Sequence, residues 1–203
     1  MRPRTSLRRT LAFSALVFAA TLLGAGLTSS VARAATYNGY FTFTKNADDP
    51  TNSRLTWEVF RTDLAPKRLV ERKSWRAGSG NGTKNSCTRN AGWLPDGKYG
   101  GTYYPAYDGS LIKGPVFYLS DTRCSAGTPR TQLFIHSEMT AGGGQNCRFE
   151  RWCWEGDKDY YSDGCIKLRP ADMHAAAAAF DRWYDQGPDP RKNRRYSELL
   201  YVQ

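Results

Sequence analysis

The sequence predicts a mainly β domain with one C-terminal α-helix at about residues 170–186. Three observations lead to this fold class. Apolar and polar residues alternate with period two in the N-terminal part, two apolar runs of strand length follow, and one alanine-rich segment comes late in the chain. The length of 203 residues is typical of one domain, which we place at residues 35–203 and expect to be a β-sandwich or a single sheet.

The strands are predicted from alternation and from the turn residues between them. The candidate strands are residues 37–44, 55–60, 68–75, 115–119 and 132–136. In the second of these, Leu55, Trp57 and Val59 fall on one face, and the polar residues 46–53 before it predict a turn. The last two runs are continuously apolar, which is typical of buried strands. The glycines of 78–82 predict a loop.

The helix is predicted from its end signals and its composition. Pro170 stands at a favoured first helical position, Gly187 follows the last turn, and alanines occupy 175–179. Its aromatic residues have helical spacing, so we expect them to pack onto the sheet rather than bind a ligand. They are Phe180, Trp183 and Tyr184.

The first 34 residues have the organisation of a signal peptide. Four arginines precede the apolar run 11–23, and Ala32-Arg33-Ala34 matches a cleavage pattern, so the secreted chain is expected to begin near Ala35. An uncleaved membrane anchor is the alternative, but the apolar run is short and interrupted by polar residues. Residues 6–11 loosely resemble a twin-arginine signal, which leaves both the Sec and the twin-arginine route open.

The charge of the chain argues against a nucleic-acid-binding arm. The formal charge is +10, but five arginines and no acidic residue precede residue 35, so 24 cations and 19 acids leave +5 on the rest. We therefore expect a mildly basic, secreted or wall-associated monomer, with no nucleic-acid partner and no stable membrane association after cleavage.

The five cysteines predict two disulfides and one free thiol in an oxidising compartment. Cys147 and Cys153 are six positions apart, which suits a small closed loop, and Cys87 and Cys124 would then pair. Four cysteines allow three connectivities, however. It also stays open whether Cys165 is the free thiol or a structural cysteine that leaves another one free.

The chemistry of the chain centres on this cysteine and one histidine. Of two histidines, His136 ends an apolar strand, whereas His174 lies inside the predicted helix. So few histidines do not make a typical zinc site, and 157–164 has serine where a calcium loop needs glycine, so we expect no metal. A thiol with a neighbouring imidazole is a nucleophile with its base. The alternative is a buried cysteine and an edge histidine that never meet.

Two short motifs resemble the L,D-transpeptidase (YkuD-type) catalytic domain. Ile135-His136-Ser137 is similar to the family's histidine strand, and the sequence Ser-Asp-Gly-Cys-Ile-Lys-Leu at 162–168 is similar to its nucleophile motif. The resemblance covers about residues 93–173 and implies an L,D-transpeptidase-like β fold.

The resemblance implies an acyl transfer on peptidoglycan stem peptides without a cofactor. Cys165 would attack the L-centre carbonyl of an L-to-D peptide bond, and His136 would take and return the proton. The Ser137 carbonyl would orient the imidazole, while the N–H groups of Gly164 and Cys165 would hold the oxyanion. An amine would then resolve the thioester into a cross-link, or water into a trimmed stem. The implied substrate contacts are Ser162, Asp163, Lys167, Arg169, Trp152 and Trp154.

The chain departs from the family pattern at three places. Asp163 replaces the usual histidine, and it would raise the thiol pKa, orient His136 or bind a substrate amine. Lys167 stands where arginine is frequent, and Arg169 is a possible substitute. The 29-position span between His136 and Cys165 is long, and we interpret the excess as a disulfide-closed lid over the cleft.

A second class of function stays open beside the enzyme. A catalytically silent wall-binding or inhibitory module on the same fold would use Cys165 only structurally. A papain-like peptidase is less favoured, because there the nucleophile precedes its histidine, and His174 follows Cys165 too closely.

Overall fold

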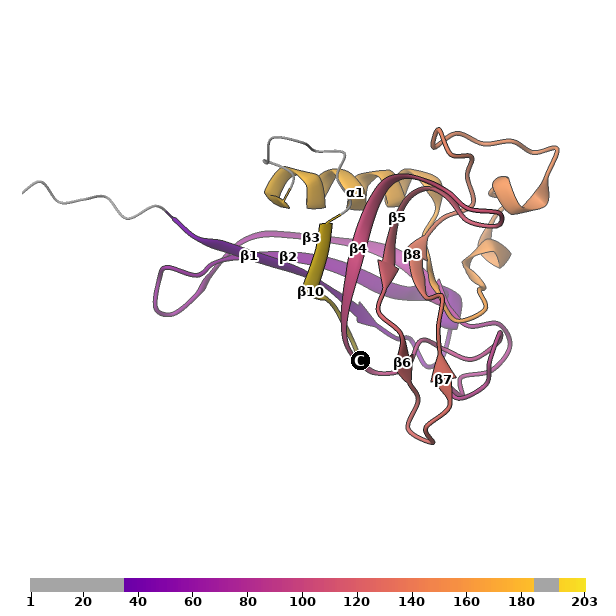
Figure 1. The fold of residues 1–203 in the computed structure, drawn as a ribbon, viewed down its shortest axis with the longest axis horizontal. Helices are drawn as coiled ribbons and strands as arrows, with labels where there is room; N and C mark the ends of the chain where they lie inside the picture. Colours follow the sequence, from indigo (N-terminus) through magenta and orange to yellow (C-terminus); the bar gives the residue numbers. More distant parts are fainter. Residues whose placement is uncertain (1–34, 185–193) are drawn as a thin grey trace, which may run out of the picture. The chain divides into compact units, whose positions relative to one another are not determined.

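Eight strands form one sheet that closes on itself in the order β1-β10-β4-β5-β8-β9-β3-β2. The structure is a computed structural model, which describes residues 35–184 and 194–203 (Figure 1). The strands are β1 Tyr37–Thr44, β2 Ser53–Arg61, β3 Arg68–Ser79, β4 Gly97–Asp108, β5 Lys113–Leu119, β8 Phe134–His136, β9 Ile166–Lys167 and β10 Arg194–Val202, and a separate hairpin pairs β6 Thr122–Arg123 with β7 Pro129–Arg130. The prediction of a mainly β domain is confirmed.

The core is built from the alternating residues of the first two strands. β1 and β2 pair antiparallel, with Phe41 opposite Trp57 and Phe43 opposite Leu55. These four side chains and Val59 are completely buried, whereas their neighbours along each strand are more exposed. The period-two pattern therefore identified both strands, and in β2 also the face that is buried.

A single α-helix, α1 Pro170–Tyr184, packs against this core (Figure 1). Its alanines Ala176 and Ala179 are fully buried and allow a close approach to the sheet. Phe180 lies among aromatic rings of the strands, with its centroid 5.0 Å from that of Phe117 and 5.7 Å from that of Trp57. The C-terminal helix and its core-facing aromatic residues are as predicted, and residues 185–186 of the predicted range lie outside the described residues.

Two long strands, β4 and β10, were not predicted. β4 contains three glycines and a proline, which are turn residues in an isolated sequence. Gly101 is needed there, because a Cβ would come within 2.7 Å of the Tyr118 carbonyl on β5. β10 begins in the cluster 191–195 that was interpreted as a solvated basic face, of which 191–193 lie outside the described residues. The glycine-rich stretch 78–82 begins inside β3 rather than in a loop.

Both predicted disulfides are present. Cys87 and Cys124 are joined with their Cα atoms 5.2 Å apart, and Cys147 and Cys153 with theirs 4.6 Å apart. Cys165 is left as the free cysteine. Two disulfides are compatible with an extracellular protein.

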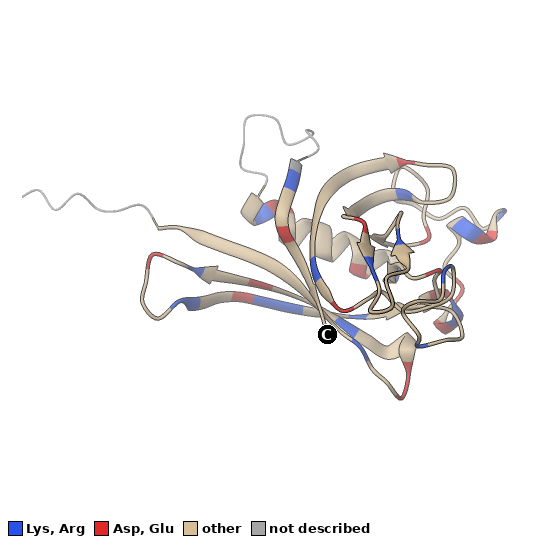
Figure 2. Cartoon of the chain, turned by 60° about the horizontal axis from the view of Figure 1, so that its bottom comes forward, with Lys and Arg blue, Asp and Glu red and all other residues tan. Residues whose placement is uncertain are grey.

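Charged residues of both signs are spread over strands and loops, as Figure 2 shows. Ion pairs cross between elements, as between Arg76 of β3 and Asp157 of the 3₁₀ helix Asp157–Tyr160. Within residues 35–184 and 194–203, no helix is long and apolar enough to cross a membrane.

Candidate active site

A short parallel strand pair brings the predicted nucleophile and base together. β8 and β9 pair with Ile135 beside Ile166 and His136 beside Lys167. Paired residues of neighbouring strands point to the same face, and so do residues two apart along one strand. Cys165, two residues before Lys167, therefore shares a face with His136. Both side chains line one cavity of about 310 Å³.

His136 is held by the backbone and is uncharged. Its ring is buried, and Nδ1 lies 3.2 Å from the carbonyl oxygen of Ser137. Burial, together with the nearby charge of Lys167, lowers the pKa of His136 to about 3. When Nδ1 donates to that carbonyl, Nε2 is the nitrogen with a free lone pair. The imidazole is therefore neutral at neutral pH and has one unprotonated nitrogen.

Cys165 is a buried thiol immediately before β9. It is 8% exposed, and its Sγ contacts the carbonyl of Gln132 at 3.7 Å. Burial, with a smaller contribution from the charge of Asp163, raises the pKa of Cys165 to about 11. A backbone hydrogen bond from Phe134 and the cations Lys167 and Arg130 act in the opposite direction. The resting site therefore pairs a neutral thiol with a neutral imidazole, rather than a thiolate with an imidazolium.

Ser162 fixes the loop that carries the thiol. Its hydroxyl donates to the carbonyl of Cys165 at 2.6 Å and accepts from the N–H groups of Gly80 and Gly164, each at 3.2 Å. The hydroxyl lines the cavity, but these three hydrogen bonds already use its donor and two acceptor sites. The N–H of Gly164, expected to serve an oxyanion, is directed to Ser162 instead.

Gly164 itself is required by its conformation and by its neighbours. Its φ is +110°, a region that side-chain-bearing residues rarely adopt. A Cβ at this position would lie 1.9 Å from Nη2 of Arg130 and 3.0 Å from the Gly92 carbonyl. The glycine before the cysteine therefore serves the close packing of this turn.

Lys167 is committed to an ion pair inside the cavity. Its ammonium contacts Oε1 of Glu138, and both side chains are largely buried. Burial raises the pKa of Glu138, while Lys167 acts against that increase. The other carboxylate oxygen of Glu138 and the hydroxyl of Ser137 are buried without a hydrogen-bond partner in the described part of the chain. Both residues line the cavity, so two buried and unpartnered polar atoms belong to its wall residues.

Three predicted substrate contacts do not line this cavity. Trp152 packs against Phe149, and Trp154 against Tyr160. Arg169 points to Asp172, at 2.8 Å, with most of its side chain exposed. The remaining cavity wall comes from residues that the sequence did not single out, and only Arg151 of these belongs to the disulfide-closed loop. They are Asn81, Leu111, Ile112, Arg151 and Tyr161.

Arg130, which does not line the cavity, is a further residue near Cys165 that the sequence analysis missed. Its guanidinium, at the end of β7, is bonded to backbone carbonyls, including that of Trp93 at 3.1 Å and that of Asp163 at 3.4 Å. The residue is only 3% exposed. No local pattern marks it, because its partners lie 33 to 44 positions away along the chain.

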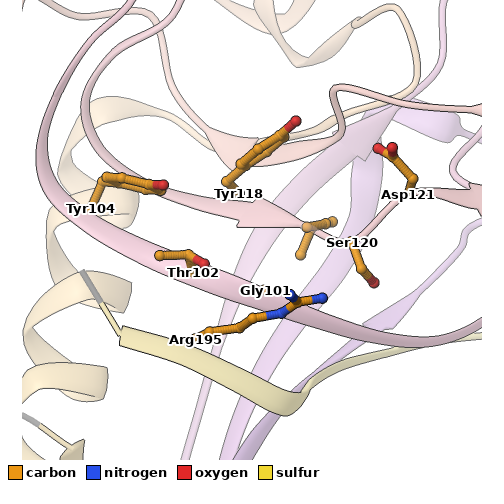
Figure 3. Close-up of a pocket in the computed structure, with 8 residues that line it drawn as sticks. Gly101, Thr102, Tyr104, Tyr118, Ser120, Asp121 and Arg195 are labelled. Carbon is orange, nitrogen blue, oxygen red and sulfur yellow. The ribbon is translucent and has the colours of Figure 1, made fainter.

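The second histidine lies elsewhere. Nε2 of His174 is 2.9 Å from the carbonyl of Gly143, and the ring lines another hollow of about 450 Å³ that contains neither Cys165 nor His136. Another hollow, of about 270 Å³, lies over β4 and β5 and has Arg195 of β10 at its rim (Figure 3). Its lining includes Tyr104, Tyr118 and Asp121, but none of the predicted site residues.

Known proteins give little guidance for this chain. No protein-family model matches it, and no curated protein matches it. Among solved structures, Bd1075 of Bdellovibrio bacteriovorus is similar, with a TM-score of 0.36 and 12% sequence identity. The match covers 68% of this chain and 43% of that one, so the chain spans less than half of the matched protein.

Replacing Asp163 by asparagine should make Cys165 more reactive. The exposed Asp163 carboxylate raises the pKa of the thiol, so its removal lowers that pKa and increases the thiolate fraction at any pH below it. We expect alkylation by iodoacetamide at pH 8 to become about two- to fivefold faster, since an exposed charge is screened by solvent. Mass spectrometry of the modified protein gives the rate.

The matched control is Asp48→Asn, another exposed carboxylate in the loop before β2, which should leave the alkylation rate unchanged. A slower reaction in Asp163→Asn would show that this side chain assists the thiol instead of opposing its ionisation.

Proposed function

We propose that the protein is a secreted cysteine acyltransferase of the L,D-transpeptidase class that acts on peptidoglycan stem peptides. The observation that carries this proposal is the free Cys165 thiol and the neutral His136 imidazole on one face of a strand pair and in one cavity. The contact between Nδ1 and the Ser137 carbonyl supports it, because it leaves Nε2 to act as base.

In the first half of the reaction, Cys165 Sγ attacks the carbonyl of an L-to-D peptide bond and passes its proton to His136. The C–N bond then breaks, and His136 returns the proton to the departing amine of D-alanine, which leaves a thioester on Cys165. Because the thiol and the imidazole are both neutral at rest, the proton moves during the attack rather than before it.

In the second half, an amine from a neighbouring stem, or water, attacks the thioester. His136 takes a proton from the attacking group and gives it to the sulfur as the C–S bond breaks. The products are a cross-link with an amine and a shortened stem with water. We assign the oxyanion to the N–H of Cys165, since the N–H of Gly164 already donates to Ser162.

Substrate contacts come from the cavity wall. Ser137 Oγ and the free oxygen of Glu138 are unpartnered polar atoms, and Asp163 stands exposed at the wall. Trp152, Trp154 and Arg169 lie outside the lining, so we now assign recognition to Arg151 and Tyr161 instead. Since Arg151 lies between Cys147 and Cys153, the disulfide-closed loop serves as the proposed lid.

The proposed location is outside the cell or in its wall. The two disulfides support it, as does the signal-like pattern of residues 1–34. Stem peptides are then the partner, and the reaction requires no cofactor.

A second candidate is a wall-binding or inhibitory module in which Cys165 is structural. The burial of Cys165, which raises the pKa of its thiol to about 11, favours this candidate. It does not involve a third disulfide, because Cys165 is free.

One incubation separates the two candidates. The protein and its Cys165→Ala variant are mixed with muropeptides that carry tetrapeptide stems, and the products are identified by mass spectrometry. We expect release of D-alanine by the parent alone, and a parent adduct with the mass of the tripeptide acyl group bound to Cys165. The fraction of dimers measures cross-linking against hydrolysis.

Equal release by both proteins would exclude Cys165 as the nucleophile. Absence of release with every stem type, together with binding of intact muropeptides by both proteins, would favour the non-catalytic module.

A further inference from the structure

Arg130 is a buried cation beside the proposed nucleophile. It is 3% exposed, and every acceptor it meets among the described residues is a backbone carbonyl. Those carbonyls belong to Ser86, Gly92, Trp93 and Asp163. Carbonyl oxygens satisfy the N–H donors, but they do not neutralise the charge. A buried charge is normally paired, so this one is available to a nearby group that becomes negative.

The group it faces is the turn before the thiol. Nη2 of Arg130 lies 3.4 Å from the Asp163 carbonyl and 1.9 Å from where a Cβ of Gly164 would be. The guanidinium is thus packed directly against the 163–164 peptide, which precedes Cys165. The ionisable groups whose charges act on Arg130 are Tyr99 and Cys165.

The position of Arg130 is fixed by the β6–β7 hairpin and by the Cys87–Cys124 disulfide. β6 and β7 pair with Thr122 opposite Arg130, and the disulfide from Cys124 holds Cys87, next to the acceptor Ser86. The loop between β3 and β4 and the loop before β9 are therefore joined through one side chain.

We propose that Arg130 is a positioning residue for Cys165. The guanidinium of Arg130 holds the 163–164 peptide in place and supplies a buried positive charge that stabilises the Cys165 thiolate as it forms. This role rests on the proposed function only in that Cys165 acts as a nucleophile. The test reads the thiol itself, so it is independent of any substrate.

The other charged groups around Cys165 are Lys167, Glu138, Asp163 and the exposed Arg151 of the same cavity wall. Lys167 of β9 is paired with Glu138, which follows β8, and His136 of β8 is neutral. Asp163 carries a negative charge that opposes the thiolate. Arg130 is therefore a buried cation next to Cys165 that forms no ion pair with a carboxylate in the described part of the chain.

The experiment is a pH titration of the Cys165 ¹³Cβ resonance in protein labelled at cysteine, comparing the parent with Arg130→Met and Arg130→Lys. Thiolate formation shifts this resonance, so the curve gives the ionised fraction without reference to accessibility. We expect Arg130→Met to move the midpoint of this curve to higher pH, which lowers the thiolate fraction at any pH below the midpoint about two- to fivefold, and Arg130→Lys to restore it to within about twofold of the parent. A folded Arg130→Met protein with an unchanged curve would overturn the proposal.

If Arg130→Met does not fold, the titration of Arg130 in the parent decides. Its ¹⁵Nε resonance should move with the ionisation of Cys165, and this movement should vanish in Cys165→Ala. Identical ¹⁵Nε curves in both proteins would overturn the proposal. An Arg130-dependent thiol in a protein that releases no D-alanine would refute the proposed function and leave the role of Arg130 standing.

Discussion

Replacing His136 by alanine should lower kcat/KM for D-alanine release by about 10²- to 10⁴-fold. The imidazole is neutral and shares the Cys165 cavity, and burial holds the thiol in its protonated form. Without a base, attack then depends on the small fraction of thiolate present at neutral pH. The measurement is the initial rate of release from tetrapeptide muropeptides, with circular dichroism to verify folding.

His174→Ala is the matched control, because it removes the other histidine. Its ring bonds the carbonyl of Gly143 and lines a different hollow, so release should stay within about twofold of the parent. Loss of activity in His174→Ala with retention in His136→Ala would mean that the base has been assigned to the wrong residue.

Replacing Gly164 by alanine should lower the free energy of unfolding by about 3 to 5 kcal/mol. Two costs combine here: the backbone at φ +110° is strained for alanine, and the new Cβ would collide with the guanidinium of Arg130. Because Arg130 is bonded to carbonyls of two loops, it cannot move away without losing those bonds. Urea denaturation followed by tryptophan fluorescence gives the change.

Gly127→Ala separates the two costs. Gly127 also has a positive φ, +82°, but a Cβ there would meet no atom within 4 Å. It should therefore lose only about 1 kcal/mol, through the backbone conformation alone. Equal losses in the two variants would show that the Arg130 contact adds nothing to the requirement for glycine.

Local patterns in the sequence predicted the parts of the fold that local patterns determine. β1, β2 and α1 were found because burial of one face imposes a period on the residues. β4 was missed because close strand approach selects glycine at Gly101, and a glycine in an isolated sequence indicates a turn instead. Tertiary packing in this case overrides local preference.

In the candidate site, too, some residues could be predicted from the sequence and others could not. His136 and Cys165 could be chosen because their residue types carry the chemistry, and the parallel pairing of β8 with β9 places them on one face. Arg130 could not be found, since a single arginine has no periodic or motif signal and its partners are distant in sequence. Trp152 was chosen by residue type, but it packs within its own loop.

The pairing of the first strand with the last one has a consequence for the maturation of the protein. β10 lies between β1 and β4, with Leu200 beside Phe41, so the ring of strands stays open until residue 202 has been synthesised. Until then β1 and β4 each present an unpaired edge that other chains can join. Before β10 has docked, the sheet that carries Cys165 is also incomplete, and all five cysteines can exchange partners in an oxidising environment. Correct pairing is therefore favoured when the sheet closes before oxidation is complete.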